Sequence, residues 1–248
     1  MPNIDPEQLR AFADDGYIVL SEIVSLDLIH AARRAIAARF EHDPPPAGHR
    51  GPHFYFLVKD LPQALQAPLY RTGAMALAGS LIAPAVFEAP DHVQISLNMP
   101  PWNHRPGGPH IDGLTPPEAD GRPGTFTMLA GIFLTHQSRV DAGNLWVWPG
   151  SHRRTADYLR EHGPEALLAS VPYPSIDLGQ PRQVTGRAGD VLLAHYMLGH
   201  NIGGNTSDTV REVLYFRLRG AGHRERWREI VQDPLLEFGP IRAAIAGC

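Results

Sequence analysis

Apolar residues recur every three or four positions in the first third of this 248-residue chain, which is the spacing of amphipathic helices. Asp5 and Pro6 supply a helix N-cap and a first helical residue, and Gly16 ends this helix. A longer helix opens at Ser25 or Asp27. The other elements expected in this part are a short strand at 17–20 and a helix at 65–81.

Beyond residue 86 the pattern changes to short extended runs separated by Gly and Pro, which favours a sandwich or barrel. The chain has no internal repeat or domain linker, so we predict one domain over 1–248. Its core is a double-stranded β-helix (jelly-roll, cupin-like) at about 83–220, with a helical part at 1–82 and a tail at 221–248. The expected strands are 86–88, 93–99, 125–135, 145–148, 183–185, 191–195 and 213–218.

The composition favours a soluble protein that acts on a small molecule. A net charge of −4 and a pI near 6.3 argue against nucleic acid or an anionic membrane as the main partner. Cys248 is the only cysteine, so no intrachain disulfide can form and a cytoplasmic setting is expected. The N-terminus lacks a secretory signal, and no stretch approaches the ~20 apolar residues of a membrane span.

A candidate metal site comes from His110-Ile111-Asp112 together with the distant His200. Residues i and i+2 of an extended segment point the same way, so His110 and Asp112 can reach one ion. His200 follows a predicted strand and can supply the third ligand. Two imidazoles and one carboxylate suit a mononuclear non-haem Fe(II) centre with open positions. Arg211 adds a planar guanidinium suited to gripping a carboxylate.

With these residues the chain resembles the phytanoyl-CoA dioxygenase family of Fe(II)/2-oxoglutarate oxygenases. The resemblance implies the jelly-roll fold and the use of Fe(II), 2-oxoglutarate and O₂. The chain departs from the family at Ile202, where a hydroxyl residue is common. The motifs that carry the resemblance are the opening segment 12–20, Pro109-His110-Ile111-Asp112, Gly143-Asn144-Leu145, Pro149-Gly150-Ser151-His152, Gly189-Asp190, and the stretch 200–207 with Arg211.

The resemblance further implies that 2-oxoglutarate chelates the iron and pairs its distal carboxylate with Arg211. A buried arginine without an anion is costly, which favours this partner over the alternative of a surface residue at the start of a strand. Gln94 and Asn98 lie on one face of an alternating strand, where bound co-substrate would satisfy them unless that face meets water. Thr127 is a weaker candidate for the same contact.

His195 competes with His200 for the third ligand position. If His195 bound the metal, the family-like spacing to Arg211 would be lost, so we favour His200. We expect His195 to line the barrel or to support a ligand. His152 is expected to shape a loop at the mouth of the site.

Three tryptophans lie near the site in the sequence: Trp102, Trp146 and Trp148. Core packing is the ordinary explanation for these residues. Trp102 lies in the loop that carries His110, so it is the best candidate for a substrate wall, with Trp146 as the second.

The expected function is an Fe(II)/2-oxoglutarate-dependent oxygenase that hydroxylates or otherwise oxidises a small organic molecule, by analogy in specialised metabolism. Asp112 occupies the position that a halide would need, which favours hydroxylation over halogenation. Lys59 is the only lysine, and no basic cluster suits a coenzyme A phosphate. The alternatives are a metal-dependent hydrolase and a non-catalytic jelly-roll binding protein built on the same residues.

Overall fold

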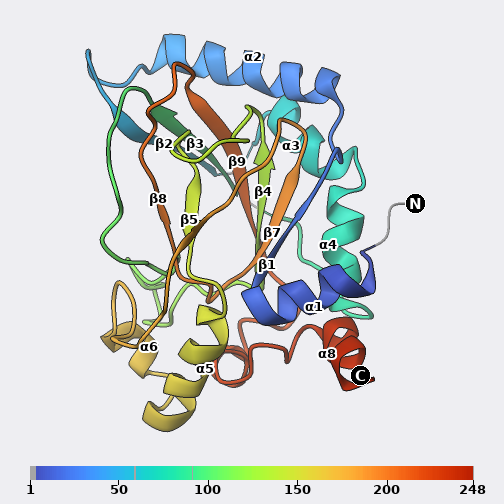
Figure 1. Cartoon of the computed structure of the whole chain (residues 1–248). Helices are drawn as coiled ribbons and strands as arrows, with labels where there is room; N and C mark the ends of the chain where they lie inside the picture. The colour runs from blue at the N-terminus through green and yellow to red at the C-terminus, as the bar shows by residue number, and fades with distance from the viewer. Residues whose placement is uncertain (1–3, 59, 91, 248) are drawn as a thin grey trace.

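Two antiparallel β-sheets lie against each other in the computed structural model, which describes residues 4–58, 60–90 and 92–247 (Figure 1). The larger sheet has the order β1-β7-β4-β9-β3-β2 and the smaller one β6-β5-β8. The core is of the predicted jelly-roll class, but no strand ladder joins the two sheets within the described residues, so the barrel is not closed. The strands are β1 (Tyr17–Leu20), β2 (Gly51–Val58), β3 (His92–Met99), β4 (Met128–Phe133), β5 (Leu145–Val147), β6 (Arg182–Gln183), β7 (Val191–His195), β8 (His200–Ile202) and β9 (Arg211–Leu218).

Helices cover the outer face of the six-stranded sheet and one end of the molecule (Figure 1). They are α1 (Pro6–Asp15), α2 (Leu26–His42), α3 (Gln63–Tyr70), α4 (Ala74–Ile82), α5 (Ser151–His162), α6 (Ala166–Ala169), α7 (Trp227–Ile230) and α8 (Gly239–Ala246). One apolar core lies between the large sheet and α1–α4 and α8, and a second lies between the two sheets. No helix in the described ranges is long and apolar enough to cross a bilayer. Lys59 and Cys248 lie outside the described residues.

The first helix forms where its capping residues predict. The Asp5 side chain accepts a hydrogen bond from the Gln8 amide at 2.8 Å, and the Gln8 side chain accepts one from the Asp5 amide at 3.0 Å. This reciprocal capping box satisfies two amides that the first turn leaves free. Gly16 has φ +84° and ends α1, because the left-handed conformation costs glycine little.

Several predicted boundaries differ from the structure. The helix expected at 65–81 is two helices, α3 and α4, because the chain turns at Thr72, whose hydroxyl accepts a hydrogen bond from the Ala74 amide at 3.1 Å. The strand expected at 86–88 is a single bridge between Phe87 and Gly220. The region expected as a tail contains α7 and α8, and strand β2 was not predicted.

Successive side chains of strand β9 alternate between the two cores. Leu214 belongs to the core beneath the helices, whereas Val213 and Tyr215 belong to the core between the sheets. Arg211 and Arg217 have the same parity as Val213 and Tyr215, so their side chains project into the space between the sheets. The candidate site lies in this space.

Candidate metal centre

His110, Asp112 and His200 lie together between the two sheets. Each offers one potential ligand atom, and the three atoms lie within 4.8 Å of one another. Asp112 Oδ1 is 3.5 Å from His110 Nε2 and 3.9 Å from His200 Nε2. The backbones of the two histidines also pair: the His110 amide donates to the His200 carbonyl at 2.9 Å, and the reverse bond is 3.3 Å. The structure therefore brings the three predicted residues together.

His200 presents one ring nitrogen to the site. Its Nδ1 lies 2.9 Å from the Leu198 carbonyl oxygen, so Nδ1–H donates to that carbonyl and the Nε2 lone pair is left toward Asp112. Burial, reinforced by the nearby His110, lowers the pKa of His200 to about 4. The imidazole is therefore neutral at neutral pH, as a metal ligand must be.

Asp112 is held in its charged form. Burial raises its pKa, but the hydrogen bond from His110, the charge that His200 carries in acid, and the charge of Arg217 outweigh burial and hold the pKa well below its usual range. The guanidinium of Arg217 lies 3.1 Å from Asp112 Oδ2, the oxygen directed away from the imidazoles. Arg217 itself lies over the ring of Phe126, at 5.6 Å from the ring centroid.

Arg211 is 2% exposed and hydrogen-bonds only to neutral groups in the part of the chain that the structure describes. Nε donates to Gln137 Oε1 at 3.2 Å, Nη1 to Ser96 Oγ at 2.7 Å and Nη2 to the Tyr215 hydroxyl at 2.7 Å. No described carboxylate lies within ion-pair distance of this guanidinium. A cation buried in this way favours an anionic ligand.

One cavity is lined by the metal triad and by Arg211. Two imidazoles and a carboxylate suit Fe(II), and their potential ligand atoms are close enough to share one ion. The buried guanidinium suits the distal carboxylate of a dicarboxylic acid that also reaches the metal. The residues present therefore fit both iron and 2-oxoglutarate.

Of the co-substrate candidates, Gln94 lines this cavity together with Ser96. Asn98 is fully buried beside it and donates to the Gly203 carbonyl at 2.8 Å, outside the lining. Thr127 does not line the cavity. Thr127 precedes β4, and its hydroxyl accepts from the Gly220 amide at 2.8 Å at a distance from the cavity lining.

The two tryptophans predicted as a substrate wall do not line the cavity. Trp102 stacks on His104 with 4.3 Å between ring centroids. In β5, Leu145 faces the cavity, so alternation turns Trp146 to the opposite face of the small sheet. The sequence pattern alone does not show which face of this short strand meets the cavity.

His195 neither lines the barrel nor supports a ligand directly. Its Nδ1 accepts from the Met197 amide at 3.0 Å, and its Nε2 donates to the Pro234 carbonyl at 2.8 Å. Its ring packs near Phe12 and Phe238 on the helix-covered face. His152 is likewise no mouth residue: it lies in the first turn of α5, is fully buried, and its Nε2 is 3.2 Å from the Ala13 carbonyl oxygen.

Arg217 and the three residues that hold Arg211 were not predicted from the sequence as site residues. Ser96, Gln137 and Tyr215 hold Arg211, and Arg217 contacts Asp112. The alternation of Arg211, Val213, Tyr215 and Arg217 was a usable signal, because a period of two places all four on one face.

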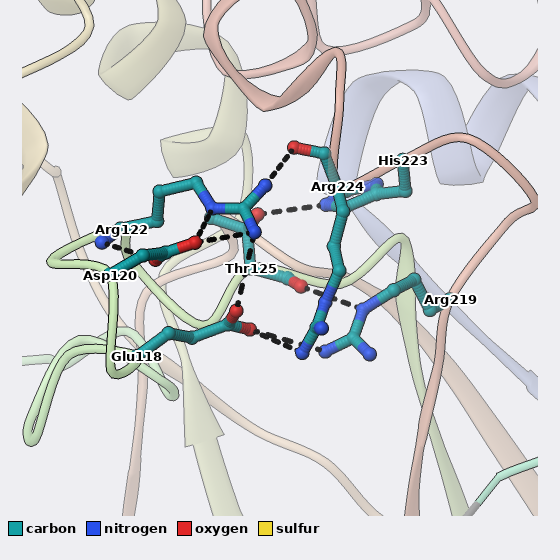
Figure 2. A network of polar contacts seen from close by, with 7 residues as sticks. All are labelled: Glu118, Asp120, Arg122, Thr125, Arg219, His223 and Arg224. Carbon is teal, nitrogen blue, oxygen red and sulfur yellow. Dashed lines mark hydrogen bonds and ion pairs between the residues drawn. The ribbon is translucent and has the colours of Figure 1, made fainter.

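The loop that follows Asp112 is anchored to the segment after β9 (Figure 2). Glu118 Oε1 lies 2.8 Å from the Arg224 guanidinium and 3.9 Å from that of Arg219. Arg219 Nε donates to the Thr125 carbonyl at 3.3 Å. These contacts fix the far end of the loop that places the metal-site carboxylate.

Solved structures with the same fold support this architecture. The carbocyclase SnoK from nogalamycin biosynthesis matches with a TM-score of 0.59 and 24% identity, over 86% of this chain and 83% of that one. The epimerase SnoN from the same biosynthesis has a TM-score of 0.63 and 18% identity, over 88% and 82%. HygX from Streptomyces hygroscopicus, with nickel and 2-oxoglutarate bound, has a TM-score of 0.58 and 16% identity, over 89% and 88%.

Sequence comparison gives the family. No curated protein sequence matches the chain significantly. The model of the phytanoyl-CoA dioxygenase family matches residues 12–213, which contain the metal triad and Arg211. This match covers most of the chain, and the fold and the donor set agree with it. The chain therefore belongs to the phytanoyl-CoA dioxygenase family of 2-oxoglutarate-dependent non-haem iron oxygenases.

Proposed function

We propose that this protein hydroxylates, or otherwise oxidises, a small organic molecule with Fe(II), 2-oxoglutarate and O₂, and that one domain over 1–248 carries the activity. The observation behind this proposal is the shared cavity: Arg211 is buried without a described counter-ion beside the triad of His110, Asp112 and His200. A metal site alone does not need a buried guanidinium at this place, whereas a dicarboxylate co-substrate does.

In this proposal each residue has one task. His110, Asp112 and His200 hold the metal through Nε2, Oδ1 and Nε2, and Arg211 pairs with the distal carboxylate of 2-oxoglutarate. Gln94 faces the same cavity and donates a further hydrogen bond to the co-substrate. When bound, iron and 2-oxoglutarate supply oxidation coupled to decarboxylation of the co-substrate to succinate. The surrounding apolar walls exclude water from the bond that is oxidised.

Proteins with similar structures carry out different reactions and bind different small molecules. SnoK is a carbocyclase and SnoN an epimerase of nogalamycin biosynthesis, and HygX has also been solved with hygromycin B bound. These neighbours support a substrate from specialised metabolism. Hydroxylation is the reaction that we propose first, because Asp112 fills the ligand position that a halide would need in a halogenase. The single cysteine supports the cytoplasm as the location.

Co-substrate turnover separates this proposal from a hydrolase built on the same ligands. Protein loaded with Fe(II) is incubated with 2-oxoglutarate in air, and succinate is measured. We expect slow succinate formation by the wild type and none by Asp112→Ala or Arg211→Ala. A wild type that binds Fe(II) but consumes no 2-oxoglutarate, with or without added metabolites, would contradict the proposal and favour the hydrolase.

A further inference from the structure

Strand β2 carries a stripe of exposed apolar side chains, Phe54, Phe56 and Val58, which are 39%, 58% and 61% exposed. The rings of Phe54 and Phe56 lie 6.2 Å apart, so they share one face of the strand. Tyr55 has the opposite parity and is buried with the helices, and its hydroxyl donates to the Asp43 carbonyl. The apolar stripe therefore lies on the inner face of the large sheet.

The apolar stripe continues the wall of the metal cavity outward. Phe54 itself lines the cavity. Phe54 pairs with Ser96 and Phe56 pairs with Gln94 across the β2–β3 ladder, and both polar partners line the same cavity. Directly opposed residues lie about 5 Å apart at Cβ, so Phe56 stands at the cavity rim. Aromatic side chains therefore extend from the cavity lining to the exposed surface of β2.

The inner walls of the cavity are apolar as well. Leu129, Leu145 and Ile202 line it from three different strands. Ile202 stands where the family often has a hydroxyl residue, which makes this wall more apolar than the family pattern. Polar recognition groups are concentrated at the triad and at Arg211, which the metal and the co-substrate use.

We propose that the apolar stripe is the docking site of the substrate, and that the substrate presents a bulky apolar body, such as a ring system, to Phe54 and Phe56. This inference rests on the proposed function, because it places the oxidised bond of that molecule beside the triad. Continuity with the metal cavity identifies the occupant as the substrate, since a second protein on β2 would cover the cavity rim.

A neutral fluorescent probe, N-phenyl-1-naphthylamine, tests the apolar stripe on protein loaded with Mn(II) and 2-oxoglutarate. We expect Phe54→Ser and Phe56→Ser each to weaken probe binding roughly tenfold, since each removes an aromatic side chain that the bound probe would cover. Val140→Ser is the matched control, because Val140 is 62% exposed and lies outside the stripe and the cavity lining. This control should bind the probe like the wild type.

Two outcomes would overturn the docking proposal. One is probe binding that is absent, or equal in all four proteins. The other is a wild-type dimer in sedimentation that Phe56→Ser dissociates, which would assign the stripe to a second copy. The Fe(II)–2-oxoglutarate charge-transfer band is recorded in the same variants. If this band forms while the probe result fails, the docking site is rejected and the proposed function stands.

Arg217 supports a second, independent inference about the metal site. Asp112 Oδ1 is the oxygen near both imidazoles, whereas Oδ2 lies 3.1 Å from the Arg217 guanidinium. We infer that Arg217 is a positioning residue that binds Oδ2 and so holds Oδ1 toward the metal. A carboxylate without this contact would be free to rotate, and Oδ1 would then face the metal only part of the time. This inference also rests on the proposed function.

Arg219 provides a matched control for Arg217. It lies two residues further along the chain and anchors the same loop through the Thr125 carbonyl, at 3.3 Å (Figure 2). Its nearest described carboxylate is Glu118, at 3.9 Å, and not Asp112. Substituting Arg219 therefore loosens the loop without removing the contact to the metal-site carboxylate.

Mn(II) affinity, measured by electron paramagnetic resonance without co-substrate, distinguishes a positioning role of Arg217 from a purely electrostatic one. Removal of a nearby cation would by charge alone tighten metal binding. We expect Arg217→Met instead to weaken it by roughly 10- to 100-fold, Arg217→Lys to recover part of the loss, and Arg219→Met to change it little. Unchanged or tighter binding in Arg217→Met, or an equal loss in Arg219→Met, would overturn the inference. Because neither 2-oxoglutarate nor turnover enters this measurement, such a result would leave the proposed function standing.

Discussion

Buried histidines in two regions of this protein differ in how their ring nitrogens are used. At the helix-covered end, His195 bonds to Met197 and Pro234, and His223 bonds to Glu237 at 2.8 Å and to Thr125 at 2.9 Å. In the cavity, one nitrogen of His200 bonds to a backbone carbonyl and the other faces Asp112.

Neither the burial nor the pKa of the histidines distinguishes the two regions. Burial lowers the pKa of both His195 and His200 to about 4, and both side chains are almost fully enclosed. The distinguishing property is a spare lone pair directed at another potential ligand. A buried polar group whose bonds are all made within the protein stabilises the fold, whereas one with a spare bond is available to a ligand.

The largest effect expected from this comparison is on iron binding. Replacing His110, Asp112 or His200 with Ala should abolish turnover, because each removes one of three protein ligands. His195→Ala should keep iron and measurable succinate formation, since both of its ring nitrogens serve the protein. Iron content after anaerobic loading checks both statements. Loss of iron in His195→Ala together with retention in His200→Ala would reverse the assignment.

The same reasoning applied to Arg211 predicts the next largest effect. Arg211→Ala should weaken 2-oxoglutarate by roughly 30- to 5000-fold, which corresponds to ~2–5 kcal/mol for truncating one partner of a buried charge pair. Arg211→Lys should recover only part, because an ammonium cannot match the planar fork. Anaerobic titration of the charge-transfer band measures both affinities. Equal affinity in all three proteins would show that Arg211 does not hold the co-substrate.

His195 should also make stability depend on pH. Its pKa is about 4 in the folded state and near 6.5 when exposed, so between these values the unfolded chain binds the extra proton. Stability should therefore be lost as the pH falls through this window, by on the order of 2–3 kcal/mol from this residue. Urea unfolding of His195→Gln should show a shallower pH slope than the wild type. Identical slopes would mean that His195 is not a buried neutral group.

The smallest expected effects come from substitutions at Gln94 and Thr127, of which only the first should change the affinity for 2-oxoglutarate. Gln94→Leu should weaken 2-oxoglutarate about 3- to 10-fold, the value of one ordinary hydrogen bond. Thr127→Val should leave this affinity unchanged and lower the free energy of unfolding by about 1 kcal/mol, because the Gly220 amide loses its acceptor. A co-substrate effect from Thr127→Val would place that residue at the site after all.

The sequence allows prediction where a short-range rule determines geometry. The capping residues of α1 predict its start, and the i, i+2 spacing of His110 and Asp112 predicts that both reach one ion. Alternation alone does not place side chains in a short strand, because the sequence of β5 does not show whether Leu145 or Trp146 faces the cavity. The partners of Thr127 and His195 come from the C-terminal region, whose docking no local pattern reveals.

The paired backbones of His110 and His200 have a consequence for local unfolding. This bridge joins the long loop to β8 at the two residues whose side chains would hold the metal. An ion bound to both rings must leave before the bridge can open, so the free energy of local opening rises by about 1.4 kcal/mol for each tenfold excess of metal over its dissociation constant. Hydrogen exchange at these two amides therefore reports metal occupancy, and iron-depleted protein would expose the loop to proteolysis first.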